Sequence, residues 1–145
     1  MPVFPSVEWF DEVRHLMNTD ESVRTAGGGM CDATVGIKCD DQVYILVFEG
    51  FECSSANQVS EDDLVNVDFY IEMTSSEWSL MLIDIKENGR AGMDYSLNTL
   101  DMDRENGLAL SKNGDQYRLD MFFRFMQTFQ NFFDLSSKIE TQFNQ

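Results

Sequence analysis

The sequence predicts an α+β domain in which a mainly antiparallel sheet is covered by helices. Three strand patterns follow one another between residues 33 and 73, two that alternate apolar and polar residues and one that is apolar throughout, with no helical pattern between them. Amphipathic helical patterns lie before this run, directly after it and near the C-terminal end. Strands and helices that are segregated in this way are typical of the α+β class. At 145 residues the chain has the commonest domain size, and we interpret residues 1–145 as a single domain.

The N-terminal part predicts two helices. Ser6 can cap a first helix, in which apolar residues recur at helical spacing over residues 9–17. Thr19 or Asp20 can cap a short second helix. The glycines at 27–29 then end it, and because no strand precedes them and no phosphate-binding motif surrounds them, we interpret them as a connector.

Three strands are predicted in the middle of the chain. Residues 33–39 alternate apolar and polar side chains, which is the pattern of a strand with one buried face. The run VYILVF from Val43 is apolar on both faces, so it predicts a strand that is covered on both sides. A polar loop over residues 54–63 follows. The alternation from Val65 to Met73 is then the clearest strand pattern in the chain.

The next segment predicts helices again. Thr74 and Glu77 have the spacing of a capping box and predict a helix that stops at Asn88. A weaker helical pattern covers residues 91–103, and a short fourth strand is predicted from Gly107.

Near the C-terminus, residues 121–133 read MFFRFMQTFQNFF, with six phenylalanines and two methionines. At about 100° per residue, all of these side chains except Phe123 fall in one broad arc of a helix. The alternation from Tyr117 also fits a strand; we favour a helix that begins at Asp115, or as late as Leu119. Such side chains can simply fill a core, but their bulk also suits a wall that closes around a ligand of variable shape.

The composition excludes several classes of function. A net charge of −16, from 10 basic and 26 acidic residues, argues against nucleic acid, which is bound by neutralising phosphates, and against anionic membrane surfaces. The N-terminus does not resemble a secretory signal, and no run of about 18 apolar residues is present. We therefore expect a cytoplasmic protein with no stable membrane insertion. Cys31, Cys39 and Cys53 lack paired spacing and predict buried thiols.

No motif for catalysis or metal binding is found. His15 is the only histidine, and no nucleophile lies at a recognisable spacing from it. The segment DMDRENG from Asp101 has its glycine at the wrong position for a calcium loop, and Lys112 stands where a glutamate is needed. The acidic cluster at 61–63 is most simply a solvated loop. We predict no cofactor and no metal site.

Arg118 is the candidate polar group of a binding site. In a regular helix it projects into the apolar arc, where its guanidinium can meet a carboxylate, phosphate or hydroxyl of a ligand. In an extended or frayed turn it lies in water or pairs with an acidic neighbour instead.

The order of VEWFDEVRHLMNTDESVR, a strand hairpin, VDFYIEMTSSEWSLMLI and NGDQYRLDMFFRFMQTFQNFF resembles a bacterial member of the sterol carrier protein 2 sterol-binding domain family. The resemblance covers nearly the whole chain. Its most specific parts are the opening helix with Glu8 and Trp9, and the strand with Asp68 that leads into the helix bearing Glu77 and Trp78. It implies a sheet of about five strands backed by helices. It also implies an apolar cavity, between the sheet and the C-terminal helix, for sterols, fatty acids or fatty acyl-CoA.

This resemblance leads us to expect noncatalytic binding and carrying of a hydrophobic, lipid-like ligand in an internal apolar cavity. Lipid-exchange members of the family are often basic, so the acidity here favours exchange with a protein partner over collision with membranes. The expected ligand-binding residues lie on the sheet, the middle helix and the last helix: Phe69, Ile71, Trp78, Leu82, Arg118, Phe122, Phe125, Met126, Phe129 and Phe133.

Two alternatives remain open from the sequence. The first is an enzyme or accessory subunit that acts on a hydrophobic substrate in the same cavity, with Asp68, Tyr70, Asp94 or Tyr95 as acid or base. Strand alternation places Asp68 and Tyr70 on the face opposite Phe69, which weakens the case for an enzyme. The second is a protein-interaction module without a cavity.

Overall fold

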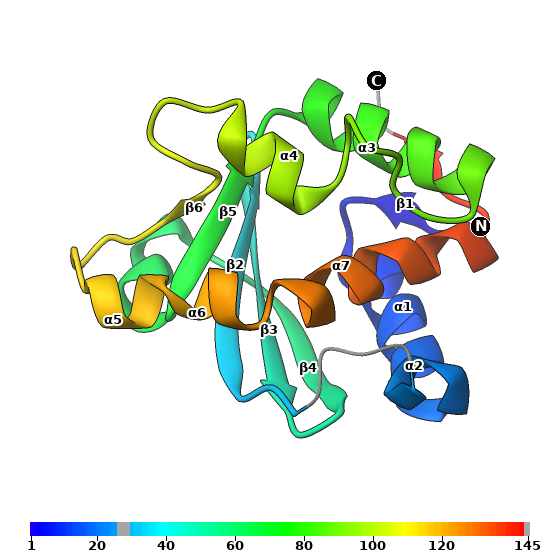
Figure 1. The fold of residues 1–145 in the computed structure, drawn as a ribbon, viewed down its shortest axis with the longest axis horizontal. Coiled ribbons are helices and arrows are strands. Elements are labelled where there is room, and N and C mark those ends of the chain that lie inside the picture. Colours follow the sequence, from blue (N-terminus) through cyan, green and yellow to red (C-terminus); the bar gives the residue numbers. More distant parts are fainter. Residues whose placement is uncertain (26–29, 144–145) are drawn as a thin grey trace.

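The computed structural model describes residues 1–25 and 30–143 and confirms the α+β class (Figure 1). The five strands of the main sheet are β2 (Ala33–Cys39), β3 (Gln42–Glu49), β4 (Glu52–Val59), β5 (Phe69–Met73) and β6 (Ala109–Leu110). The helices are α1 (Val7–Thr19), α2 (Glu21–Thr25), α3 (Ser75–Asn88), α4 (Leu97–Met102), α5 (Gln116–Leu119), α6 (Met121–Arg124) and α7 (Met126–Asp134), with the 3₁₀ helices η1 (Glu61–Asn66) and η2 (Leu135–Lys138). The predicted glycine connector at 27–29 lies outside the described residues.

The two ends of the described chain lie together. Strand β1 (Val3–Phe4) pairs in parallel with strand β7 (Gln142–Phe143), and the Gln142 N–H donates to the Pro2 carbonyl at 2.9 Å. This small sheet is separate from the main one.

The main sheet is mixed: three of its four strand pairs are antiparallel, in line with the expected mainly antiparallel sheet, and one pair is parallel. Its order is β4-β3-β2-β5-β6. Strand β3 is antiparallel to both β2 and β4, and β6 is antiparallel to β5, but β2 and β5 are parallel, with Val35 opposite Phe69. Because β4 points the same way as β2, the chain must return to the opposite end of the sheet before it can begin β5.

The return from β4 to β5 passes over the back face of the sheet through η1. Leu64 and Val67 are buried there against Val43 and Tyr70 in a small second core. Gly36 of β2 lies directly below, where a Cβ atom would be 2.5 Å from Leu64 Cδ2 and 2.7 Å from Tyr70 Cβ. Glycine at this position therefore lets η1 approach the sheet closely.

The front face of the sheet carries the main core. It is covered by α1, α3 and α7, and α6 and α7 run across the strands (Figure 1). Leu46 and Phe48 of β3 face this core, whereas Val43 of the same strand faces the second core. Strand β3 is thus covered on both sides, as its doubly apolar sequence predicts.

The predicted helix caps are confirmed. The Ser6 hydroxyl accepts a hydrogen bond from the Trp9 N–H at 3.1 Å, which starts α1. Thr74 and Glu77 form a reciprocal capping box at the start of α3, with distances of 3.2 and 3.0 Å. Gly89, with φ of 79°, ends α3 in the left-handed region that glycine tolerates.

Two strand boundaries were wrong. The predicted polar loop over residues 54–63 contains most of β4, an edge strand whose Ser54, Asn57 and Gln58 give no apolar alternation. Backbone pairing with β3 holds this strand, so its side chains needed no strand pattern. The predicted strand from Val65 starts only at Phe69, because the preceding residues form the crossover.

Two helices are also shorter than predicted. The pattern over residues 91–103 gives only α4, which the hydroxyl of Ser96 caps by accepting from the Thr99 N–H at 3.2 Å. The C-terminal helix begins after Asp115, as favoured, but it is divided into α5, α6 and α7 at Asp120 and Phe125. Aromatic residues and threonine are weaker helix formers than alanine or leucine, so packing on the sheet decides the path of this segment.

Candidate functional site

An aromatic layer joins the sheet to the C-terminal helices. Phe69 of β5 contacts the rings of Phe122 and Phe129, with ring centroids 5.6 and 5.3 Å apart. Phe48 of β3 contacts Phe129 and Phe132 at 5.3 and 5.6 Å. All four contacts are edge-to-face, the favoured arrangement of aromatic pairs. The rings of the sheet and of α6–α7 therefore interlock at this place.

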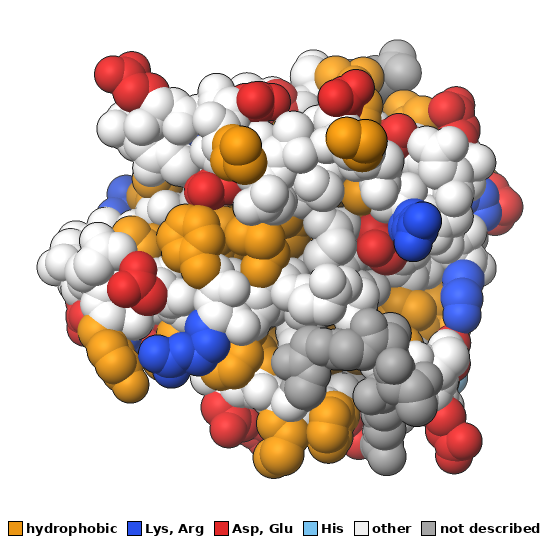
Figure 2. Space-filling model, viewed as in Figure 1, with side chains coloured by type: hydrophobic (Ala, Val, Ile, Leu, Met, Phe, Trp, Pro, Cys, Tyr) orange, Lys and Arg blue, Asp and Glu red, His pale blue; other side chains and the backbone are white. Residues whose placement is uncertain are grey.

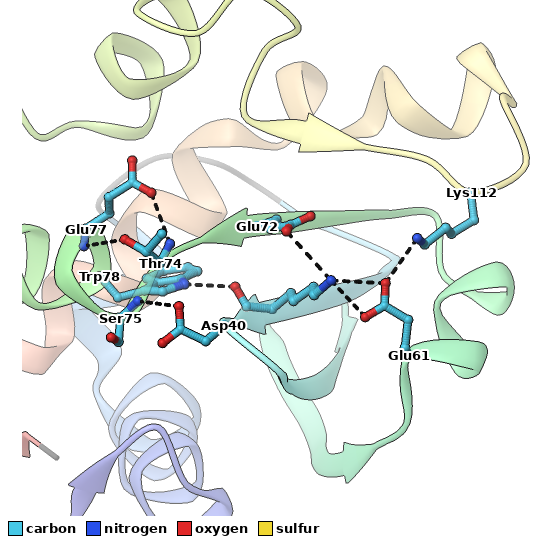
Figure 3. Close-up of polar contacts among 9 residues, drawn as sticks. Asp40, Glu61, Glu72, Thr74, Ser75, Glu77, Trp78 and Lys112 are labelled. Carbon is cyan, nitrogen blue, oxygen red and sulfur yellow. Dashed lines mark hydrogen bonds and ion pairs between the residues drawn. The ribbon is translucent and has the colours of Figure 1, made fainter. Parts of the chain in front are cut away.

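A second group of rings continues the layer toward the N-terminus. Trp78 of α3 lies 5.4 Å from Phe133 and 5.7 Å from Phe4, measured between ring centroids. The indole N–H of Trp78 donates to the Lys38 carbonyl at 3.0 Å, which satisfies the one polar atom of a fully buried side chain (Figure 3).

The structure brings together the nine apolar residues predicted from the sequence. Seven of them are buried in the main core: Phe69, Ile71, Trp78, Leu82, Phe122, Phe129 and Phe133. Phe125 and Met126 are partly buried and pack against the same core. Phe48 and Phe132 also belong to the layer. The arc predicted over residues 121–133 included Phe132, whereas the doubly apolar β3 gave no pattern that singled out Phe48.

The layer reaches the surface where α6 meets α7. Phe125, between the two helices, has φ of −111° and ψ of 19°, which interrupts the helical path. Leu100 of α4, Met121 of α6 and Met126 of α7 are, like Phe125, only partly buried against the core. Figure 2 shows hydrophobic side chains gathered on the surface between α4 and α6. Apolar side chains that pack against the main core are thus partly exposed to solvent in this area.

The Arg118 guanidinium is hydrogen-bonded to two groups of the protein itself. Its Nε donates to Asp68 Oδ1 at 2.8 Å, and its Nη2 donates to the Asn66 carbonyl at 3.3 Å. The other oxygen of Asp68 accepts from the Thr34 N–H at 2.8 Å. Pairing with an acidic neighbour, one of the two possibilities left by the sequence, is the arrangement seen here, and it ties α5 to the start of β5.

The groups named for an enzyme do not converge. Asp68 is in the ion pair with Arg118, and Tyr70 is buried on the back face beneath the Lys112 ammonium, 5.4 Å from the ring centroid. Asp94 is exposed in the segment before α4, whereas Tyr95 of the same segment is partly buried against the main core. The face that strand alternation predicts for Tyr70, opposite Phe69, is confirmed.

A polar cleft of about 450 Å³ lies at the N-terminus of α3, outside the aromatic layer. It is lined by Asp40, Glu72, Glu77, Arg104 and Glu105, among others. Thr74 and Glu77 of the capping box line the cleft, and the Ser75 N–H beside them donates to Asp40 Oδ1 at 3.2 Å. Figure 3 shows these contacts. Desolvation acts to raise the pKa of Glu77, but hydrogen bonds from Thr74 and Arg104 outweigh it and hold the pKa below the usual value.

The same region contains an ion-pair network. Lys38 Nζ lies 2.8 Å from Glu61 and 3.6 Å from Glu72, and Lys112 Nζ lies 3.1 Å from Glu61 (Figure 3). Glu61 and Asp62 are exposed, as expected of a solvated acidic cluster, but they lie at the start of η1 and not in a loop, and Glu61 is held there by Lys38 and Lys112. Within residues 1–25 and 30–143, no group of histidine, cysteine, aspartate or glutamate is placed to hold a metal ion.

The segment before α4 is fastened to α7 by two side chains. Asp134 Oδ1 accepts from the Ala91 N–H at 3.0 Å and from Gln130 Nε2 at 2.8 Å, and Gln130 Oε1 accepts from the Leu97 N–H at 2.8 Å. Burial raises the pKa of Asp134. A cavity of about 590 Å³ lies along these residues and Gln127. The polar face of α7 therefore positions α4 beside the apolar area.

Replacing Gln130 by methionine is expected to loosen this segment. The change keeps the length of the side chain but removes the acceptor for Leu97 and the donor to Asp134, at a cost of about 1–3 kcal/mol. Amide hydrogen exchange over residues 91–102 should become about tenfold faster, or more, for local opening. Gln127→Met is the control, because the Gln127 amide bonds only to Asn131 of the same helix. Equal exchange in both variants would contradict this role of Gln130.

Comparison with known proteins does not assign the chain to a family. No family model, curated protein or solved structure matches it. Function is therefore inferred from the geometry above.

Proposed function

We propose that this protein binds and carries a hydrophobic, lipid-like small molecule, such as a sterol, fatty acid or fatty acyl-CoA, without catalysing a reaction. The observation that carries the proposal is the interruption of the helices that cover the aromatic layer. We call this cover, which consists of α5, α6 and α7, the roof. The three helical segments of the roof are short, and the gap at Phe125 brings apolar side chains to the surface. The resemblance to the sterol carrier protein 2 family and the five-stranded sheet backed by helices support the same function.

Ligand entry requires movement of the roof. The rings of Phe48, Phe69 and Phe129 touch one another, so a ligand between the sheet and α6–α7 must displace at least one of them. A lipid-like molecule that buries about 300 Å² of apolar surface gains about 7.5 kcal/mol, at roughly 25 cal/mol per Å². Loss of the contacts of one such ring costs up to about 3–5 kcal/mol. Off-rotamer side chains cost about 0.5–1.5 kcal/mol each, so the gain can offset the displacement of one ring together with the adjustment of Phe125 and Met126. The internal cavity is thus formed as the ligand enters.

The net charge of the protein affects which source can supply the ligand. With a net charge of −16, the protein is repelled by anionic bilayers. No helix in the described part of the chain is both long and apolar enough to cross a membrane. As part of this proposal, the protein is a cytoplasmic carrier that exchanges its ligand with a protein partner and not with an anionic bilayer.

Phe125→Asp is expected to abolish ligand uptake, because it places a carboxylate at the apolar entrance, where desolvation penalises the charge. The delipidated protein is incubated with a sterol, a fatty acid and an acyl-CoA, and uptake is measured by native mass spectrometry.

The matched control for this experiment is Phe123→Asp. Phe123 lies two residues earlier, in α6, but it is 53% exposed, so the variant should bind as the wild type does. The proposal fails if the wild type takes up none of the three compounds.

A further inference from the structure

Most cations of the described chain are committed to carboxylates. Seven form ion pairs: Arg14, Lys38, Lys86, Arg104, Lys112, Arg118 and Lys138. Arg90 and Arg124 are the two described arginine side chains for which no carboxylate lies within ion-pair distance in the described residues. In a chain with 26 acidic and 10 basic residues, a guanidinium is expected to have a carboxylate partner, so Arg90 and Arg124 are exceptions.

Arg124 is the last residue of α6 and directly precedes the gap in the roof. Its guanidinium carbon lies 5.6 Å from the ring centroid of Tyr117 and 5.9 Å from that of Phe125. Both distances are typical of cation–π contacts. Because no ion pair to Arg124 is found among the described residues, its N–H donors can bind a planar acceptor in bidentate fashion.

Arg124 places a cation beside the partly exposed apolar side chains at Phe125, which we call the entrance. The contact with the Phe125 ring places Arg124 beside the interruption between α6 and α7. Figure 2 shows basic side chains over α5 and α6 on the same face of the molecule as the hydrophobic side chains between α4 and α6. A long-chain acid could place its chain in the aromatic layer and its carboxylate against Arg124. The negative charge of the protein opposes the approach of any anion, so an unpaired cation at the entrance supplies the attraction that is needed locally.

We infer that Arg124 recognises the acidic end of the ligand, which makes the ligand an aliphatic carboxylic acid rather than an uncharged sterol. This inference rests on the proposed function and narrows its class of ligand. The role that the sequence assigned to Arg118 passes to Arg124, because Asp68 already occupies the Arg118 guanidinium.

The test compares ligands that differ only at one end. Dodecanoate, 1-dodecanol and acetate are titrated into the delipidated protein, and binding is measured by calorimetry. The wild type should bind dodecanoate about tenfold more tightly than dodecanol, as expected for one partly exposed charge-assisted contact. Acetate should not bind measurably, because the chain supplies the affinity.

Substitutions then locate the contact. Arg124→Met should remove the preference for the acid while the affinity for dodecanol stays the same, and Arg124→Lys should restore part of it. Arg90→Met is the matched control, since Arg90 also lacks an ion pair but lines the cavity beside Asp134. Circular dichroism checks that each variant is folded.

The outcomes separate this inference from the proposed function. If the wild type binds the acid and the alcohol equally, or if Arg124→Met keeps the preference, the assignment to Arg124 is wrong while lipid binding stands. If acetate competes with dodecanoate at similar concentrations, the site is one for free anions and the inference is also wrong. If neither twelve-carbon compound binds, the proposed function itself fails.

Discussion

Phe129→Ala is expected to destabilise the protein by about 3–5 kcal/mol, the usual cost of truncating a buried phenylalanine. The Phe129 side chain is only 1% exposed, and its ring meets those of Phe48 and Phe69 at 5.3 Å each. Truncation removes both contacts and leaves a space that interlocked neighbours cannot fill by small movements. A typical domain has a free energy of unfolding of only about 5–15 kcal/mol, so the Phe129→Ala variant should keep only a small margin of stability.

Phe123→Ala provides the control for this prediction. It makes the same change of side chain in the same segment, but Phe123 is 53% exposed, so the free energy of unfolding should change by about 0.5 kcal/mol or less. Both values are measured by urea denaturation at one pH. Similar small losses in the two variants would show that Phe129 does not join the sheet to α7 in the way described here.

Raising the pH from 8 to 10 is expected to lower the free energy of unfolding by about 4 kcal/mol through three buried thiols. Desolvation raises the pKa of Cys31 and Cys53 from the ordinary value of 9.0 to about 12, and that of Cys39 to about 11. Above pH 9 the thiols of the unfolded chain lose protons while those of the folded protein keep them. Alkaline pH therefore favours unfolding, by about 1.4 kcal/mol for each thiol at pH 10. Burial also raises the pKa of Tyr44, which acts in the same direction.

Single cysteine variants test the origin of this pH dependence. Urea unfolding is measured at pH 8 and pH 10 in the presence of a reductant, for the wild type and for Cys53→Ala. The variant should be less stable at both pH values, but the difference between them should shrink by about one third, because one of three equal contributions is gone. An unchanged difference would mean that Cys53 ionises as readily in the folded protein as in the unfolded chain.

The sequence by itself determined the elements that depend on neighbouring residues. The caps at Ser6 and Thr74 need partners only three residues away, and both were predicted correctly. The two-residue period predicted β2, and helical spacing predicted the buried face of α1. The apolar arc of residues 121–133 placed Phe129 and Phe133 in the core for the same reason, since the spacing of residues along one element fixes which side chains share a face.

Only the tertiary structure decided the features that depend on distant residues. Strand β4 is held by its backbone pairing with β3, so its neutral polar sequence could not reveal it. The parallel pairing of β2 with β5 follows from the crossover that Gly36 allows to lie close to the sheet. Asp68 is 50 residues from Arg118, so spacing along the sequence could not show that their ion pair occupies the Arg118 guanidinium. Sequence periodicity records which face of an element is apolar, but it does not record which distant side chain will meet that face.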